Sequence, residues 1–467
     1  MEQNASNTLN TAVRVIANSK KFYRSMPKTV GFIEPLNFIV VLGVICFLMV
    51  TLGACTQSDE KKAEKGMEEQ PAQMEAMVPE ETGKAFEGPM EGFTLKWSYP
   101  VVDTAQNTCY DEKGTVIDPP TSGDPLFGQD AQYSGIKPSY EDNGDGTVTD
   151  LNTGLIWEKS PEFKQYKYRD AGKYCEDLTV GGRTNWRLPS VKELFSLTDF
   201  RGKRVSGEAT ELSIPYIDTQ YFDFRYNPDL PMATNFWTRT MHVKGPLIDD
   251  TAECVFGVNF AHGTIKAYVT GYRFDDPTQA IIDPIYYQPS NYIRCVCDDL
   301  NKEYGENAFV DNGDQTVTDK ATGLMWQQAD DRQTRDWFEA LQYAEKLNLA
   351  GHTDWRLPNV KELQSIVDYE KLNIPAIEET FFRVSNPDSW FWTSTTNGDK
   401  AYNAMYICFG KAYAKLPEQT EFYNHHGAGA ERSAPKRGDI SDYDQTSVNA
   451  TDETRIRNYV RCVRDAG

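Results

Sequence analysis

The chain has 467 residues, with 48 basic and 69 acidic side chains and a formal net charge of −21 at pH 7. Residues 1–54 hold five basic and two acidic groups, so the remaining chain carries a net charge of −24. A surface this acidic repels nucleic acids and other long polyanions over a screening length of about 8 Å. The composition therefore excludes nucleic-acid-binding proteins as a class, and the length is sufficient for two hydrophobic cores.

Residues 1–54 have the layout of an export signal. Several lysine and arginine side chains precede an uncharged apolar run, LNFIVVLGVICFLMVTL, that begins at Leu36. The run ends in Leu-Gly-Ala-Cys, which resembles a bacterial lipobox and implies lipidation of Cys55 after cleavage in front of it. We therefore expect a lipoprotein of a Gram-negative bacterium, held by Cys55 in the outer membrane or at the cell surface. A transmembrane anchor is the alternative.

Residues 55–95 form an acidic segment rich in Glu, Lys, Gln, Met and Pro, with few aromatic residues. Such a composition buries too little apolar surface to offset the entropy lost on ordering. We expect a disordered tether that separates the folded part of the chain from the membrane.

The rest of the chain contains a long repeat. The segment DNGDGTVTDLNTGLIW ends at Trp157 and returns as DNGDQTVTDKATGLMW, which ends at Trp326, 169 residues later. The segments TNWRLPSVKEL and TDWRLPNVKEL are separated by the same 169 residues. This period is the size of a domain, because solenoid units span only about 20–50 residues. We therefore predict two tandem copies of one domain, over residues 96–300 and 301–467.

Each copy is expected to begin with a β-hairpin, because an Asn-Gly turn at 143–144 or 312–313 precedes the alternating strand TVTD. One helix is predicted after the hairpin and another after the WRLP segment. The second helix starts at a capping box, which spans 190–193 in the first copy and 359–362 in the second. These patterns indicate an α+β domain with short strands and a small number of helices.

Three features resemble functional sites. Asp142, Asn143 and Asp145 resemble part of a calcium loop, but an EF-hand needs flanking helices and a glutamate at its twelfth position, where this chain has Asn152. An Asx-stabilised turn is the favoured interpretation, with Ca²⁺ as the minor alternative and no other cofactor expected.

The WRLP arginines and the tryptophans of the FWT segments are also predicted to be structural. Arg187 and Arg356 are each followed six residues later by a glutamate, and no nucleophile accompanies them. Ion pairs that fix the helix junction are therefore favoured over catalytic groups. Trp237 and Trp392 are favoured as core residues over residues that stack on sugar rings.

The motifs NGDGTVTD…TGLIW, NWRLPSVKEL, FWTS and NYVRCVR together resemble the Lcl C-terminal domain family, named for a domain of a bacterial collagen-like adhesin. The resemblance covers about 140–298 and 309–465. It implies a compact C-type-lectin-like fold, similar to that of formylglycine-generating enzymes, with two helices on a small, twisted antiparallel sheet. The adhesin recognises sulfated glycosaminoglycans. This chain lacks a collagen-like region, and its negative charge disfavours sulfated polymers.

We therefore expect a non-catalytic, adhesin-like surface protein that binds a glycan or another component of the envelope or host. Two alternatives remain open at this point. One is an oxidase related to formylglycine-generating enzymes, and the other is a structural component of an envelope or appendage assembly.

Seven cysteines follow Cys55, at positions 109, 175, 254, 295, 297, 408 and 462. An exported compartment permits disulfides. The second copy holds only Cys408 and Cys462, and a bridge between them is predicted. In the first copy a bridge between Cys175 and Cys295 is predicted, and the other three cysteines are left unassigned.

A long insertion, HHGAGAERSAPKRGDISDYDQT, spans residues 425–446 before the last strand of the second copy. A loop longer than about 15 residues in a compact domain is usually functional or disordered. In lectin-like folds the long loop before the final strands commonly carries the ligand site. We therefore expect ligand contacts from this insertion, with a variable surface loop as the alternative. The candidate residues are Arg432, Lys436, Arg437, Asp439 and Tyr443. The first copy has an unrelated segment at 270–290.

Overall fold

The computed structural model of the protein describes eight segments of the chain: residues 95–204, 212–228, 231–242, 252–272, 290–298, 304–415, 419–443 and 451–467. All of them belong to one compact unit, Lys84–Gly467. The predicted export signal, the lipidation site at Cys55 and the tether up to residue 94 lie outside the described residues. None of the helices in these eight segments is long and apolar enough to cross a membrane.

Each copy contains a small antiparallel sheet in which the closing strand pairs with the opening hairpin. In the first copy the order is β3 (Tyr140–Asp142), β4 (Thr147–Asp150), β5 (Leu155–Glu158) and β9 (Val296–Asp298). In the second copy it is β10 (Phe309–Asp311), β11 (Thr316–Asp319), β12 (Leu324–Gln327) and β19 (Val463–Asp465). The predicted hairpins are confirmed, and their Gly144 and Gly313 have φ angles of 74° and 75°, which glycine adopts without steric cost.

The described residues form four α-helices, two in each copy. They are α3 (Tyr168–Glu176), α4 (Val191–Ser196), α6 (Trp337–Lys346) and α7 (Val360–Ser365). Helices α4 and α7 begin with the predicted capping boxes, because the side chains of Ser190 and Asn359 accept hydrogen bonds from the amides of Glu193 and Glu362. With short strands and few helices, the protein has the α+β composition that the sequence predicts.

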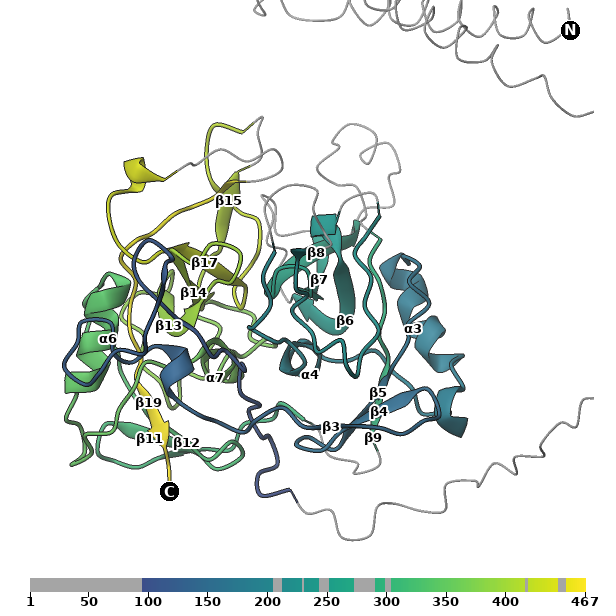
Figure 1. Ribbon diagram of the computed structural model, residues 1–467, viewed down its shortest axis with the longest axis horizontal. Coiled ribbons are helices and arrows are strands. Elements are labelled where there is room, and N and C mark those ends of the chain that lie inside the picture. Colours follow the sequence, from purple (N-terminus) through teal and green to yellow (C-terminus); the bar gives the residue numbers. More distant parts are fainter. Residues whose placement is uncertain are drawn as a thin grey trace, which may run out of the picture. The chain divides into compact units, whose positions relative to one another are not determined.

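The two copies are joined through one six-stranded antiparallel sheet (Figure 1). The first copy contributes β6 (Asn235–His242), β7 (Ala252–Asn259) and β8 (Thr264–Tyr272), and the second contributes β13 (Trp390–Thr396), β14 (Asn403–Cys408) and β17 (Glu431–Pro435). The order β13-β14-β17-β8-β7-β6 places β17 and β8, one from each copy, side by side at the centre. The order is symmetric about this central pair, which gives the copies an approximate twofold relation.

Several shorter elements complete the described fold. The first copy begins, ahead of its repeated motifs, with β1 (Cys109–Tyr110), β2 (Val116–Ile117) and the 3₁₀ turn η1 (Asp130–Gln132). The second copy adds a three-stranded sheet of β16 (Tyr423–Asn424), β15 (Tyr413–Lys415) and β18 (Thr451–Asp452), and the 3₁₀ turn η6 (Ile440–Asp442). Two further 3₁₀ turns, η2 (Val180–Gly182) and η4 (Pro231–Ala233), lie in the first copy.

Equivalent lysines cross the junction between the copies in both directions. Lys192 of α4 donates to the backbone oxygen of Ser365 at the end of α7 (2.9 Å), and Lys361 of α7 donates to that of Ser196 at the end of α4 (2.8 Å). Burial lowers the pKa of each lysine to about 8. The lysine of the repeated VKEL motif is therefore an interface residue, and the reciprocal pairs follow the twofold relation of the sheet.

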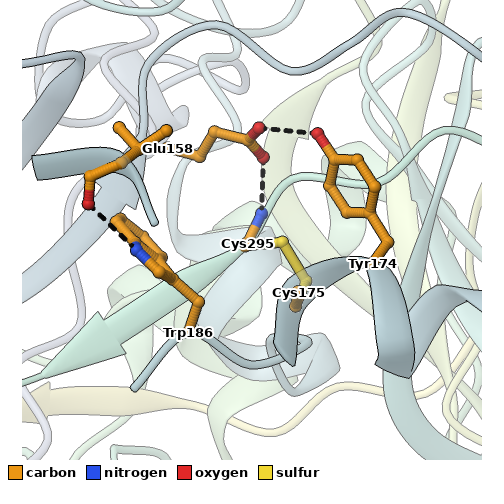
Figure 2. The surroundings of a disulfide bond; sticks show 6 residues. Glu158, Tyr174, Cys175, Trp186 and Cys295 are labelled. Carbon is orange, nitrogen blue, oxygen red and sulfur yellow. Dashed lines mark hydrogen bonds between the residues drawn. A yellow bond between two sulfur atoms is a disulfide. The ribbon is translucent and has the colours of Figure 1, made fainter. Parts of the chain in front are cut away.

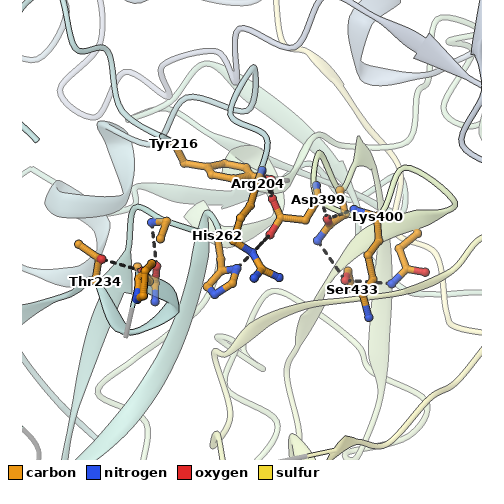
Figure 3. A network of polar contacts seen from close by, with 12 residues as sticks. Arg204, Tyr216, Thr234, His262, Asp399, Lys400 and Ser433 are labelled. Atoms are coloured by element: carbon orange, nitrogen blue, oxygen red, sulfur yellow. Dashed lines mark hydrogen bonds and ion pairs between the residues drawn. The ribbon is translucent and has the colours of Figure 1, made fainter. Parts of the chain in front are cut away.

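A polar network adds a third contact between the copies (Figure 3). Asp399 of the second copy accepts hydrogen bonds from the Tyr216 hydroxyl (2.9 Å) and the Arg204 amide (2.6 Å) of the first copy, and its carboxylate lies 3.0 Å from Nδ1 of His262. Burial raises the pKa of Asp399, but the contact with His262 and the other donors outweigh it, so the pKa is lowered overall.

Apolar packing also continues across the junction. Phe256 of β7 and Tyr369 of the second copy form an edge-to-face pair with ring centroids 4.9 Å apart. Both belong to a buried cluster that contains residues of both copies, so the two domains share part of one core.

Candidate functional site

The predicted Cys175–Cys295 disulfide is present (Figure 2). It links α3 to the segment before β9. Beside it, the Glu158 carboxylate accepts hydrogen bonds from the Tyr174 hydroxyl (2.8 Å) and from the amide of Cys295 (3.1 Å). In the second copy Gln327 replaces this glutamate. All of these contacts are internal to the domain, so the disulfide is structural.

The predicted Cys408–Cys462 bridge is wrong in this structure. Both cysteines are fully buried, and each is a free thiol. Cys462 occupies the position of Cys295 in the second copy, but the position that matches Cys175 is Ala344, which lies in the same apolar cluster. Cys462 therefore has no partner on the helix. Burial raises the pKa of both thiols, so they are un-ionised.

Peptide mapping of the denatured, unreduced protein tests this disulfide pattern. We expect one linked peptide pair that contains Cys175 and Cys295, and full alkylation of Cys408 and Cys462. A linked pair that contains Cys408 and Cys462 would show that the free thiols are not the native state. A reduced sample, in which all four are alkylated, is the control.

The acidic turn is the predicted Asx turn. Asp142 accepts a hydrogen bond from the amide of Gly144 (3.1 Å), and Asp145 accepts one from the amide of Thr147 (3.0 Å). The Asn143 side-chain amide donates to the Thr147 hydroxyl (2.8 Å), and Lys159 forms an ion pair with Asp142 (2.5 Å). These carboxylates are therefore engaged within the turn. Within the eight described segments, no cluster of three or more His, Cys, Asp or Glu side chains could hold a metal ion.

The WRLP ion pairs and the buried tryptophans are also confirmed. Arg187 pairs with Glu193 at 2.7 Å, and Arg356 pairs with Glu362 at 2.6 Å, in each case at the start of the helix after WRLP. Trp237 is fully buried, and so is Trp392. The tryptophans are thus core residues, and the arginines are held in ion pairs at the helix junctions.

The insertion at 425–446 is not a loop throughout, because its residues 431–435 form β17 at the centre of the six-stranded sheet. Arg432 on this strand forms an ion pair with Asp452 of β18, and the ring of His426 lies 2.8 Å from the same carboxylate. Burial raises the pKa of Asp452, but Arg432 and His426 outweigh it and hold the pKa well below its usual range. Arg432 therefore joins two sheets.

Lys436 is also a structural residue. Its side chain is fully buried, and its ammonium group lies 4.5 Å from the ring centroid of Trp337. Burial lowers its pKa to about 7. The expectation that Arg432 and Lys436 contact a ligand is thus not supported, because Arg432 is held by Asp452 and Lys436, directly after β17, is buried.

The part of the insertion that follows β17 borders a pocket of about 690 Å³. The lining residues are Asp336, Arg437, Gly438, Asp439, Ile440, Glu453, Thr454, Arg455, Ile456 and Arg457. Two predicted site residues, Arg437 and Asp439, are therefore brought together here with a segment just before the closing strand. We refer to this site as the arginine pocket.

Two arginines of this pocket are exposed and are positioned by the start of α6. Asp336 and Glu339 form the capping box of that helix. Arg437 lies 3.4 Å from the Asp336 carboxylate, and Arg457 lies 2.7 Å from the Glu339 carboxylate. The two arginine side chains are 62% and 53% exposed, so each guanidinium group keeps donors that face solvent.

The third arginine, Arg455, supports the pocket from beneath. Its side chain is 28% exposed, it pairs with Glu453 (2.8 Å), and it donates to the backbone oxygen of Asp388 (3.1 Å). Its guanidinium carbon lies 4.0 Å from the ring centroid of Trp390. These contacts fix its orientation.

Asp439 and Tyr443 shape the rim of the arginine pocket. Asp439 caps η6 by accepting hydrogen bonds from the amide (2.9 Å) and hydroxyl (2.8 Å) of Ser441, and these bonds lower its pKa. The Tyr443 hydroxyl donates to the backbone oxygen of Arg437, and its ring stacks on Tyr402 with centroids 5.6 Å apart. The aromatic pair is thus joined to the backbone of Arg437.

Sequence reasoning missed Asp336, Arg455 and Arg457. The two arginines lie directly before the NYVRCVR motif, and their alternation with Ile456 is the signal that could have drawn attention to them. Most of the matching segment of the first copy, 273–289, lies outside the described residues.

A duplicated α+β domain, a shared sheet and an exposed pocket on the second copy define a tandem-domain protein with a candidate ligand site. The model of the Lcl C-terminal domain matches residues 146–274 and 315–427, which together make up more than half of the chain. The protein therefore belongs to the Lcl C-terminal domain family and carries the domain in tandem, as the repeat predicts. No curated protein and no solved structure matches this chain significantly.

Proposed function

We propose that the protein is a non-catalytic, adhesin-like binding protein, and that its arginine pocket holds a short glycan that bears a carboxylate. The observation that carries this proposal is the pair of exposed guanidinium groups, Arg437 and Arg457, fixed on the two carboxylates of one capping box. A guanidinium group presents paired donors that match a carboxylate, and the fixed position reduces the entropy cost of binding.

The aromatic pair and the overall charge narrow the ligand class. The Tyr402–Tyr443 stack borders the same segment of chain as Arg437, and aromatic faces suit the apolar faces of sugar rings. The net charge of −21 repels a long polyanion, whereas a short ligand is held by the local arginines within about one screening length. A small acidic oligosaccharide therefore fits better than a sulfated polymer.

We further propose a C-type-lectin-like fold for each copy and a lipid anchor at Cys55 that places the domains on the outer membrane or the cell surface. The pairing of β5 with β9, and of β12 with β19, supports this fold because it brings the two ends of each copy together. The position of the arginine pocket, in the segment before the closing strand, suits the same arrangement.

The cysteines support a binding role over an oxidase role. An oxidase of the formylglycine-generating type needs an accessible pair of reactive cysteines. Cys175 and Cys295 are joined in a buried disulfide, and Cys408 and Cys462 are buried thiols with raised pKa values. Reactive cysteines have the opposite properties, namely exposure and a lowered pKa.

A glycan array followed by calorimetry tests the proposed binding site. We expect the folded protein to bind carboxylated oligosaccharides, and the Arg437→Ala, Arg457→Ala double variant to bind them about 10- to 100-fold more weakly, since a hydrogen bond to a charged group contributes about 1.5–3 kcal/mol. Arg169→Ala, at an arginine of the first copy that is 80% exposed, is the matched control.

Two outcomes would contradict the proposal. One is the absence of any glycan signal from the folded protein. The other is an equal loss of binding in the control and in the double variant, which would indicate a general effect of charge.

A further inference from the structure

A cavity of about 960 Å³ lies between the two copies. Its walls include Lys192 of α4, Thr240 and Met241 at the end of β6, and Tyr369 of the second copy. Its lining contains none of the residues of the arginine pocket. We call this cavity the open groove.

The approximate twofold relation provides a counterpart of the open groove on the second copy. Lys361 and Phe200 are 169 residues from Lys192 and Tyr369. Thr395 matches Thr240, because the two hydroxyls accept hydrogen bonds from the first amides of α7 (3.0 Å) and α4 (2.9 Å). The counterpart is therefore formed by the equivalent groups, each supplied by the other copy.

In the counterpart groove the chain's own N-terminal segment, residues 103–106, acts as a plug. The Gln106 side chain accepts from the amide of Thr396 (2.9 Å) and donates to its backbone oxygen (2.8 Å). The backbone oxygen of Thr104 accepts from the amide of Phe200 (2.9 Å), and that of Asp103 accepts from Lys361 (3.0 Å). The plug therefore binds both copies through a short, turned stretch of backbone, in which Ala105 has a φ of 63°.

Asp130 completes the plug. Its buried carboxylate accepts hydrogen bonds from the hydroxyls of Thr395 (2.5 Å) and Thr104 (2.8 Å). Only a cavity of about 80 Å³ remains beside it.

Two equivalent groups of the open groove, the Thr240 hydroxyl and the Tyr369 amide, lack these partners within the described residues. The Thr240 hydroxyl accepts from Val191 but has no acceptor for its own hydrogen, whereas Thr395 donates to Asp130. The amide of Tyr369 has no acceptor there, whereas that of Phe200 donates to the plug. The open groove thus presents the Thr240 hydroxyl and the Tyr369 amide to an occupant, whereas Lys192 already donates to the backbone oxygen of Gly305 (2.9 Å) and to the side-chain oxygen of Asn307 (3.1 Å).

The rim of the open groove differs from its counterpart in charge and in shape. Glu306, Asp368, Glu370 and Glu378 line it and favour basic side chains. In addition, Tyr304 stands where the counterpart has Gly135, whose backbone lies so close to the Asp103 carboxylate that an added Cβ would meet it at 2.9 Å. An aspartate at that position of an occupant is therefore excluded by the tyrosine.

We propose that the open groove binds a short, basic peptide segment of a partner protein in the manner of residues 103–106. A backbone oxygen of the peptide accepts from the amide of Tyr369, as that of Thr104 accepts from Phe200. The hydroxyl of Thr240 faces the same groove, where a second part of the partner can take the place that Asp130 has beside Thr395. A lysine or arginine faces the acidic rim. This site is separate from the arginine pocket, and the proposal does not depend on glycan binding.

A labelled peptide tests the groove directly. The probe is a fluorescein-labelled peptide of residues 100–108 in which Asp103 is replaced by lysine, titrated with the full chain in fluorescence anisotropy. We expect saturable binding, weakened about tenfold or more by reversal of two exposed rim charges, Glu306→Lys with Glu370→Lys. The Glu141→Lys, Glu421→Lys variant has the same net charge but is changed outside the groove, so it should bind like the parent protein.

Hydrogen exchange provides a second readout that does not require a variant. The amide of Phe200 should be protected in the free protein, whereas that of Tyr369 should become protected only when the peptide is added. The proposal is overturned by the absence of saturable binding, by equal weakening in both charge variants, or by a Tyr369 amide that is already protected without peptide.

Discussion

Replacement of Arg461 with alanine is expected to lower the free energy of unfolding by about 3–5 kcal/mol. This arginine of the NYVRCVR motif is fully buried and donates to the backbone oxygens of Gln327 (2.6 Å), Gln328 (2.6 Å) and Arg383 (2.9 Å). Each carbonyl that loses its donor in the interior costs about 1–3 kcal/mol. The side chain also lies over the rings of Phe382 and Phe391, and that packing is lost as well.

Chemical denaturation at pH 7 measures this effect, and two further variants make it interpretable. Arg461→Lys keeps the positive charge but lacks the planar guanidinium group with its several donors. We therefore expect the lysine variant to recover only part of the lost free energy of unfolding. Arg457→Ala, at a side chain that is 53% exposed, should change the stability by less than about 1 kcal/mol. A loss below about 1 kcal/mol in Arg461→Ala would show that the three carbonyls find other donors. Arg294 makes the equivalent three contacts in the first copy.

The second large effect is a dependence of stability on pH that originates at Asp130. Burial raises the pKa of this carboxyl from 3.8 to about 7. The folded state therefore retains a proton that the unfolded state releases between these two values. The contribution of Asp130 to the free energy of unfolding is therefore largest below about pH 4 and decreases as the pH rises to about 7. The decrease is about 1.4 kcal/mol for each unit of pKa difference.

Asp130→Asn removes this dependence and is the direct test. An amide remains uncharged, so we expect the variant to be more stable than the parent protein above pH 7 and to lose the decrease in stability between pH 4 and 7. Denaturant unfolding at several pH values provides the measurement, with Asp124→Asn, an exposed carboxyl of the same segment, as the control. Parallel pH profiles for parent and variant would show that Asp130 is ionised in the folded protein.

Local features of this fold could be predicted from the sequence because their determinants lie within a few residues of one another. The capping boxes at Ser190 and Asn359 depend on a residue three positions away, and the Asx turn at Asp142 depends on the next five residues. The disulfide could be predicted because the repeat shows that Cys175 has no counterpart in the second copy.

The arrangement of the copies could not be predicted in this way. The contact between β8 and β17 joins Ile265 to Glu431, and Gln106 meets Thr396 across 290 residues of chain. Neither contact has a local pattern, since the strand β17 is short and lies within a segment rich in glycine and charge. The structural roles of two candidate site residues could not be predicted for the same reason. Arg432 and Lys436 have the sequence pattern of surface cations, but Arg432 lies on β17 and pairs with Asp452, and Lys436 is buried.

The plug has a consequence for stoichiometry. Two identical subunits with this twofold interface would carry two N-terminal segments and could close both grooves. In the single chain that carries both copies, the eight described segments include two grooves and one segment that fills a groove as residues 103–106 do. Among the described residues, closing the groove of the second copy leaves the other without an equivalent occupant, and each copy can specialise while keeping a similar scaffold.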